Sequence, residues 1–137
     1  MSVQLAAQLA GCSTEEIWSR AMGKFRSVSL DRVTQRHMLC RDPDAGLLAL
    51  TQPAKFGEVD AFITHSWDDD ASSKWESLRL WRANFKRRHG REPRVWIDKY
   101  CMDQSDIGHE LSVIPLYVIF CRELVVLYGR NYLDRLW

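Results

Sequence analysis

The sequence predicts an α/β fold in which three parallel strands alternate with helices in the order β-α-β-α-β. Three short apolar runs support this, at residues 59–65, 95–97 and 124–128, and each ends in polar residues. The sequence between the runs has helical periodicity, and right-handed crossovers would place all three strands in one sheet. We therefore predict a domain over residues 59–137, with Trp96 in its core.

Residues 1–58 have a different pattern, which predicts a mainly helical or irregular extension. Ser13 and Glu16 have the spacing of a capping box, and the helix behind them would bury one apolar face. The residues of that face are Ile17, Trp18, Met22 and Phe25. Residues 27–40 fit either a strand or a helix, and both alternatives stay open. The Asp-Pro-Asp-Ala-Gly sequence at 42–46 predicts a turn.

The first crossover is predicted to be a helix that starts at a second capping box, formed by Ser73 and Glu76. Its apolar face consists of Trp75, Leu78, Trp81 and Phe85. The basic run 86–89 and Gly90 would end it, because cations in the last turn and a following glycine are common at helix ends. We prefer this explanation to a nucleic-acid patch, because Glu92 follows and no aromatic residue interleaves the charges.

The second crossover is also predicted to be a helix, with apolar residues at spacings of 4, 3, 4 and 3. These residues are Ile107, Leu111, Ile114, Val118 and Cys121. We expect Pro115 to kink this helix or restart it, because proline lacks a backbone N–H and clashes with the preceding turn. After the third strand, residues 132–137 are predicted to begin a third helix.

Composition and charge argue against several classes of protein. Hydrophobic residues make up 46% of the 137 residues, which is enough for a packed core, and the formal net charge is +1. Lysine and arginine number 7 against 6 acidic residues before residue 59, and 12 against 12 from there on. Neither part is a basic module, so we expect no binding to nucleic acid or to anionic membranes.

The cysteines and the amino terminus indicate a reduced, cytoplasmic protein. The four cysteines lie far apart and form neither a C-x-x-C pair nor a zinc-ligand pattern. They are Cys12, Cys40, Cys101 and Cys121. The first residues lack the basic segment of a secretory signal, and no apolar run approaches the ~18 residues of a membrane span. We therefore expect a soluble protein without a membrane partner.

Polar residues that could bind a ligand follow the first predicted strand. They are Thr64, His65, Ser66, Trp67, Asp68, Asp69 and Asp70. They lie at a strand's carboxyl end and beside a helix amino terminus, where backbone N–H groups can hold phosphate. Trp67 could stack on a base or on a nicotinamide ring. Alternatively, the aspartates only cap the helix and complement its dipole.

Asp98 follows the second strand and would lie near this loop if the two strands are neighbours. Clustered carboxylates could bind Mg²⁺ or accept a phosphoryl group, as in response-regulator receivers. We prefer the simpler interpretation that Asp98 accepts hydrogen bonds from nearby backbone N–H groups and shapes its loop. A further alternative pairs Cys101 with His65 as nucleophile and base, although a lone cysteine in such a loop is usually inert.

Three segments resemble Toll/interleukin-1 receptor (TIR) domains. D-A-F-I-T-H-S at 60–66 is similar to the opening strand and loop, D-x-F-[IL]-S-[HFY]. D-K-Y-C-M-D-Q at 98–104 is similar to the second-strand aspartate and the BB loop, and also to the D-x-x-C-I-N-Q of fungal heterokaryon-incompatibility domains. Residues 125–128 and 131–137 resemble the third strand followed by S-x-x-Y-x-x-S-x-W. The resemblance covers 59–137 and is closest to TIR-like proteins of protists and algae.

The resemblance implies a flavodoxin-like parallel sheet of TIR type, incomplete after its third strand. It also implies homotypic association with other TIR-like domains in signalling, or cleavage of NAD at the nicotinamide–ribose bond. The residues it assigns to the NAD site are Thr64, His65, Ser66, Trp67, Asp68, Asp69 and Asp98. The family's catalytic glutamate lies in W-C-x-x-E. That position falls after Trp137, and Glu110 and Glu123 do not match it, so we expect this chain to be inactive.

Three hypotheses about function follow from these features. The leading one is a fragment of a TIR-like signalling domain, whose parent hydrolyses NAD or assembles by TIR contacts. The second is a receiver-like phosphoacceptor that uses Asp98 and the aspartates at 68–70 with Mg²⁺. The third is an interaction domain without a small-molecule ligand. A sheet cut after its third strand is also expected to expose apolar residues at its edge.

Overall fold

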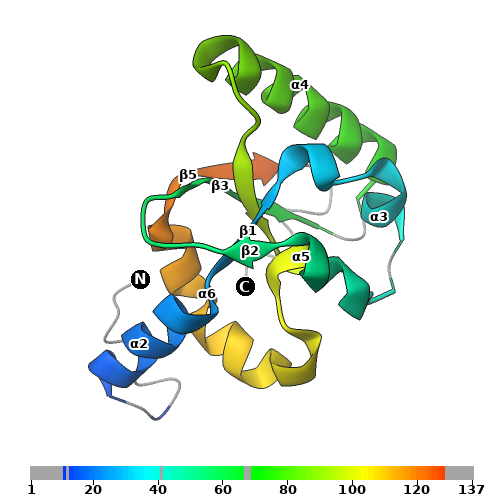
Figure 1. Cartoon of the computed structure of the whole chain (residues 1–137). Coiled ribbons are helices and arrows are strands. Elements are labelled where there is room, and N and C mark those ends of the chain that lie inside the picture. The colour runs from blue at the N-terminus through cyan, green and yellow to red at the C-terminus, as the bar shows by residue number, and fades with distance from the viewer. Residues whose placement is uncertain (1–10, 12, 41, 67–68, 129–137) are drawn as a thin grey trace.

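The computed structural model describes residues 11, 13–40, 42–66 and 69–128, and its described strands form one mixed sheet (Figure 1). The strand order is β2-β1-β4-β3-β5. The strands are β1 (Arg26–Ser29), β2 (Gln52–Pro53), β3 (Val59–His65), β4 (Arg94–Ile97) and β5 (Cys121–Leu127). The α-helices are α2 (Thr14–Lys24), α3 (Gln35–Leu39), α4 (Ala71–His89), α5 (Asp98–Cys101) and α6 (Ile107–Phe120). The 3₁₀ helices are η1 (Leu30–Arg32), η2 (Ala45–Leu50) and η3 (Gln104–Asp106).

The three predicted strands share one sheet and run parallel. β3 lies in the centre, with β4 on one side and β5 on the other. Ala61 of β3 lies opposite Val95 of β4 and Glu123 of β5. β5 begins at Cys121, three residues before the predicted start. The prediction from the apolar run was too short at this end, because an edge strand can contain exposed polar residues such as Arg122.

The extension, which was predicted to be mainly helical or irregular, also contributes strands: β1 falls partly within 27–40, where a strand was one of the two alternatives, and β2 was not predicted. β1 pairs with β4 and β2 pairs with β1, both antiparallel, so the sheet is mixed and not purely parallel. The ambiguous residues 27–40 contain both alternatives, because a strand is followed there by η1 and α3. Buried Val28 of the extension belongs to the same hydrophobic core as Val95. The predicted helix at 132–137 lies outside the described residues.

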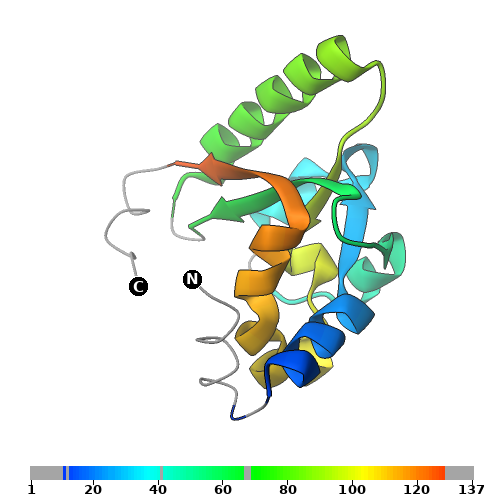
Figure 2. The same cartoon turned by 90° about the vertical axis from the view of Figure 1, so that its left-hand side faces the viewer.

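Helices cover both faces of the sheet (Figure 2). α4 lies on one face, whereas α2 and α6 pack together on the opposite face. The chain reaches β4 from β3 through α4, and then returns past β3 to β5 through α6. Because these crossovers move in opposite directions along the sheet, the same right-handed rule places their helices on opposite faces.

The start of α2 agrees with the prediction. The Glu16 N–H donates to Ser13 Oγ at 3.2 Å, and the Ser13 N–H donates to Glu16 Oε2 at 2.8 Å, so the capping box is confirmed. Ile17 is buried as expected, but Trp18 remains 38% exposed. Trp18 still packs edge-to-face against Phe120 of α6, with ring centroids 5.1 Å apart.

The predicted capping box at the start of α4 is wrong. The helix begins at Ala71, and Asp70 caps it by accepting hydrogen bonds from the N–H groups of Ser72 and Ser73. A carboxylate one residue before the helix reaches these donors, so Ser73 lies inside the first turn. The predicted helix end is confirmed, because Gly90 adopts a φ of 69° and its N–H donates to a carbonyl of the last turn.

α6 continues through Pro115, so the helix does not restart there. Its buried residues, which pack against the rest of the core, are Glu110, Val113, Leu116, Tyr117 and Phe120. The predicted face is therefore wrong in part, since Ile107 is 42% exposed and Leu111 is 56% exposed, and most of the buried positions lie one residue earlier in the chain than the predicted ones.

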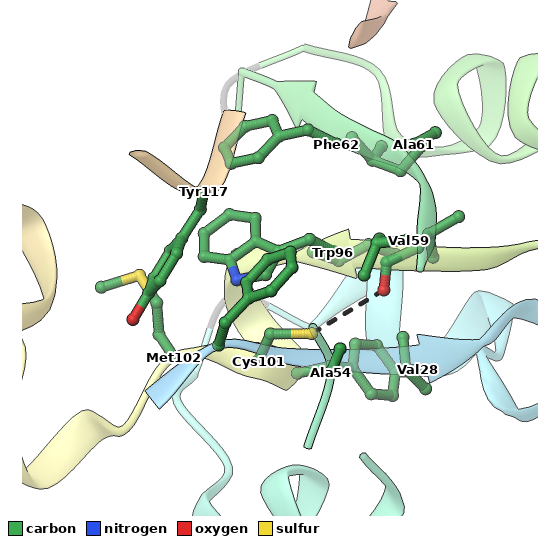
Figure 3. Packing of buried hydrophobic residues seen from close by; sticks show 14 of the residues in the cluster. Val28, Ala54, Val59, Ala61, Phe62, Trp96, Cys101, Met102 and Tyr117 are labelled. Carbon is green, nitrogen blue, oxygen red and sulfur yellow. Dashed lines mark hydrogen bonds between the residues drawn. The ribbon is translucent and has the colours of Figure 1, made fainter. Parts of the chain in front are cut away.

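Tyr117 of α6 packs against Trp96, which in turn stacks on Phe62 with ring centroids 4.4 Å apart (Figure 3). Trp96 therefore lies in the core, as predicted. No helix in the described part of the chain is long and apolar enough to cross a membrane.

Candidate functional site

The carboxyl ends of β3 and β4 form one rim of the sheet. His65 is the last residue of β3, and Asp98 directly follows β4. The two strands are parallel neighbours with Ile63 opposite Ile97, so Thr64, His65 and Asp98 come to the same edge. This juxtaposition was expected from the sequence. Trp67 and Asp68, which were also assigned to the site, lie outside the described residues.

The imidazole of His65 is surrounded by charged groups of the rim. Burial lowers the pKa of His65, and the positive charges of Lys74 and Lys99 lower it further. The carboxylate of Asp98 acts in the opposite direction but does not reverse the shift. His65 is therefore neutral at physiological pH, and a neutral imidazole can donate one hydrogen bond and accept another.

Two lysines are buried beside the rim, and sequence reasoning missed both. Lys74 is 3% exposed, and its ammonium group donates to the carbonyl of Ser66 at 2.6 Å. Lys99 is 6% exposed, and its ammonium group donates to the carbonyl of Cys40. Lysine is almost always exposed, so nothing in the local sequence indicated this burial. The two ammonium groups bring positive charge to a rim that also carries the carboxylate of Asp98.

The acidic loop before α4 is used for capping. Hydrogen bonds from Ser73 and Ser72 lower the pKa of Asp70, which keeps the capping carboxylate charged. This supports the capping interpretation for Asp70. It also occupies two backbone donors that a phosphate would need at the start of α4. Asp69 is buried, and its N–H donates to the carbonyl of Ser66 at 3.4 Å.

Asp98 has one oxygen engaged and one that can accept further hydrogen bonds. Its Oδ1 accepts a hydrogen bond from the Lys99 N–H at 2.7 Å, which is the loop-shaping contact that we preferred from the sequence. Its Oδ2 accepts no hydrogen bond from the described residues. Within that part of the chain, no group of three or more histidine, cysteine, aspartate or glutamate side chains could hold a metal ion.

A pocket of about 290 Å³ opens beside Asp98. It lies between the segment that follows β4, the first turns of α6 and the part of the extension that joins α3 to η2. Its lining residues are Asp42, Pro43, Asp98, Lys99, Met102, Gln104 and Leu111. The sequence singled out segment 98–104, but not the contributions of Asp42, Pro43 and Leu111, because these come from elements distant in the chain.

Cys101 does not take part in this site. Burial raises the pKa of its thiol to about 12, and Sγ lies 3.9 Å from the carbonyl oxygen of Val95 (Figure 3). A thiol with so high a pKa is protonated at neutral pH and is a poor nucleophile. The inert interpretation of Cys101 is therefore supported over a nucleophile–base pair.

Comparisons with known proteins add no assignment. No protein-family model matches this chain, and no match is found among curated proteins or solved structures. The resemblance to TIR domains consequently rests on the three sequence motifs alone.

Proposed function

We propose that this chain is a TIR-like signalling module that binds NAD at the carboxyl rim of β3 and β4. One observation carries the proposal: the first crossover runs from β3 to β4, and the second runs from β4 back past β3 to β5, so the direction of the strand order reverses at β3. Ligands of doubly wound α/β proteins bind outside the carboxyl ends of strands at such a point. His65 and Asp98 lie at that rim, as the TIR motifs imply.

The chemistry of the rim is compatible with a dinucleotide. The carboxylate of Asp98 lines a pocket and can accept hydrogen bonds from the hydroxyl groups of a ribose, whereas both ring nitrogens of His65 are buried behind the rim. The charges of Lys74 and Lys99 offset the neighbouring carboxylates, so a ligand with phosphates is not simply repelled. The residues named here bind and orient, and none of them is assigned a catalytic step.

NAD binding can be tested by titrating the ¹⁵N-labelled full chain with NAD and following its backbone amide signals. We expect saturable shifts at His65, Ser66 and Asp98. Asp98→Asn should weaken binding, while the matched variant Asp31→Asn should not. Asp31 is a suitable control because it lies near the amino end of β4, whereas Asp98 follows the carboxyl end. The N–H of the preceding residue, Leu30, donates to the carbonyl of Pro93, directly before β4. The absence of any saturable shift would favour an interaction domain without a small-molecule ligand.

Homotypic assembly is a second candidate function, and the exposed side of β5 favours it. Leu124 is 52% exposed and Val126 is 40% exposed, on a strand at the edge of the described sheet. Apolar side chains on an edge strand commonly mark an interaction surface. Sedimentation velocity should detect a concentration-dependent oligomer that the double variant Leu124→Lys, Val126→Lys reduces. An unchanged monomer over the whole concentration range would reject assembly through this surface.

A further inference from the structure

We propose that the pocket beside Asp98 binds the adenosine half of NAD, with the Asp98 carboxylate on the ribose hydroxyls. This inference rests on the proposed NAD site and states which half of the dinucleotide lies where. It also makes Asp98 the residue that selects a ribose with a free 2′-hydroxyl group.

The position of Asp98 in the topology is the first support. In doubly wound dinucleotide-binding folds, an acidic residue beside the second strand accepts hydrogen bonds from the ribose of the adenosine half. β3 is the first of the parallel strands here, β4 is the second, and they are direct neighbours. Asp98 directly follows β4. The nicotinamide half would then extend along the rim towards His65 and the carboxyl end of β5.

The orientation of the carboxylate is the second support. The backbone N–H of Lys99 donates a hydrogen bond to Asp98 Oδ1 at 2.7 Å, which orients the carboxylate. Asp98 Oδ2 can then accept a hydrogen bond from a ligand. The ammonium group of Lys99 donates to the carbonyl of Cys40, so the residue that holds Oδ1 is itself tied to a distant segment of the chain. A carboxylate held in this way can accept from two adjacent hydroxyl groups without first losing side-chain freedom.

The size and lining of the pocket are the third support. Its volume of about 290 Å³ is at the small end of the range for ligand pockets, roughly 300–1,000 Å³, which suits one nucleoside better than a whole dinucleotide. Met102 and Leu111 offer apolar contact for a base. Gln104 supplies an amide that can pair with a base edge. The same pocket therefore has an apolar side and a hydrogen-bonding side, as a nucleoside does.

The charge around the pocket predicts its selectivity. A phosphate on the 2′ position would meet the carboxylates of Asp98 and Asp42, whereas a hydroxyl group would donate to Asp98. Lys99 lies in the same lining, but its ammonium group is already engaged by a carbonyl. NAD should therefore bind more tightly than NADP, and AMP more tightly than 2′-deoxy-AMP.

The test compares AMP, 2′-deoxy-AMP, nicotinamide mononucleotide, NAD and NADP on the full chain by calorimetry and methyl NMR. We expect AMP to shift the methyl signal of Met102 and to bind at least about tenfold more tightly than 2′-deoxy-AMP, since a hydrogen bond to a charged group is lost. Asp98→Asn should reduce this ratio, and Asp31→Asn should leave it unchanged. If Asp98→Asn fails to fold, the ratio measured on the unaltered chain still decides.

The outcomes separate this inference from the proposed function. NAD binding that nicotinamide mononucleotide competes away and AMP does not would overturn the placement of adenosine and leave the NAD site intact. Equal affinity for AMP and 2′-deoxy-AMP would overturn the role of Asp98. No binding of NAD would overturn the proposed function, and no binding of AMP would overturn this inference in the same experiment.

Discussion

The ion pair between Asp60 and Arg91 offers a sharp test of how the site is held in place. Asp60 is 3% exposed, and its two carboxylate oxygens accept from the two terminal nitrogens of the Arg91 guanidinium group, each at 2.8 Å. It also accepts from the Arg94 N–H at 2.9 Å. The pair thus ties β3 to the segment that leads into β4, the two strands that carry the rim.

Arg91→Met should lower the free energy of unfolding by about 2 kcal/mol at neutral pH. Breaking a fully buried pair costs about 3–5 kcal/mol, because the remaining charge is left uncompensated. The loss should be smaller here, since Arg91 is 48% exposed and the Arg94 N–H still reaches Asp60. Urea unfolding followed by circular dichroism measures the difference. Arg87→Met is the matched control, and this exposed arginine of α4 should change stability by less than about 0.5 kcal/mol.

The same variant should alter the dependence of stability on pH. Burial by itself would raise the pKa of Asp60, but hydrogen bonds from Arg91 and Arg94, together with the Arg91 charge, lower it below its ordinary value. The stabilisation is therefore complete above the unfolded pKa, about 3.9, and is lost as the pH falls through the folded value. The difference between the two proteins should stay constant from about pH 7 to about pH 5 and shrink as the pH falls below the unfolded pKa, about 3.9. A difference below about 0.5 kcal/mol at neutral pH, or one that does not change with pH, would refute this reasoning.

Three further predictions follow from individual side chains. Asp70→Ala should lower the free energy of unfolding by about 1 kcal/mol, because alanine cannot cap α4. Asp70→Asn should keep most of the stability, because the asparagine side-chain oxygen can still accept from the backbone. Equal stability of the two variants would contradict the capping role. An exposed Cys40 should react with a thiol reagent in the native protein while buried Cys101 does not, as peptide mapping would show. Burial raises the pKa of Glu110 above its unfolded value, so the free energy of unfolding should fall as the pH rises from the unfolded to the folded pKa of this carboxyl group. Glu110→Gln should remove this pH dependence, because the amide does not titrate and its oxygen can still accept from the Tyr117 hydroxyl. An unchanged pH dependence in this variant would show that Glu110 is not its source.

The central strands were predictable because burial on both faces leaves continuous apolar runs in the sequence. β1 and β2 were not predictable on this basis, because they are four and two residues long and contain Arg26, Gln52 and Pro53. They are strands because they pair with a neighbour, which is a tertiary interaction. The start of α4 was misplaced for a related reason, since both Asp70 and Ser73 are good capping residues and only the path of the chain decides between them.

The candidate site was also predictable only in part. The meeting of His65 and Asp98 follows from strand order alone, and the structure places both at one rim. The burial of Lys74 and Lys99 depends on carbonyl groups of distant segments, and the pocket depends on how α6 packs. Such features arise from the packing of segments distant in the chain, so the local sequence carries no signal for them.

The Asp60–Arg91 pair also changes how the first TIR-like motif should be interpreted. Asp60 opens the D-x-F pattern, and a binding role could be assigned to it by resemblance alone. Its carboxylate is fully used by Arg91 and by the Arg94 backbone, at the amino end of β4 and away from the rim. The aspartate is therefore a structural residue that fixes two strands against each other. Only the carboxyl-terminal part of the motif, from Thr64 onward, remains available for a ligand.

Residues 1–58 contain none of the three TIR-like motifs, and yet they help to form the pocket beside Asp98. Asp42 and Pro43 line the pocket beside Asp98, and the carbonyl of Cys40 anchors Lys99. β1 covers the side of β4 that would otherwise be the edge of the parallel strands. A ligand in the pocket would touch both the extension and the TIR-like segment. Its selectivity would thus depend partly on the residues that the motifs do not cover, and Asp42→Asn should weaken the discrimination between NAD and NADP without affecting AMP. An unchanged ratio of the two affinities, measured by calorimetry, would assign that selectivity to Asp98 alone.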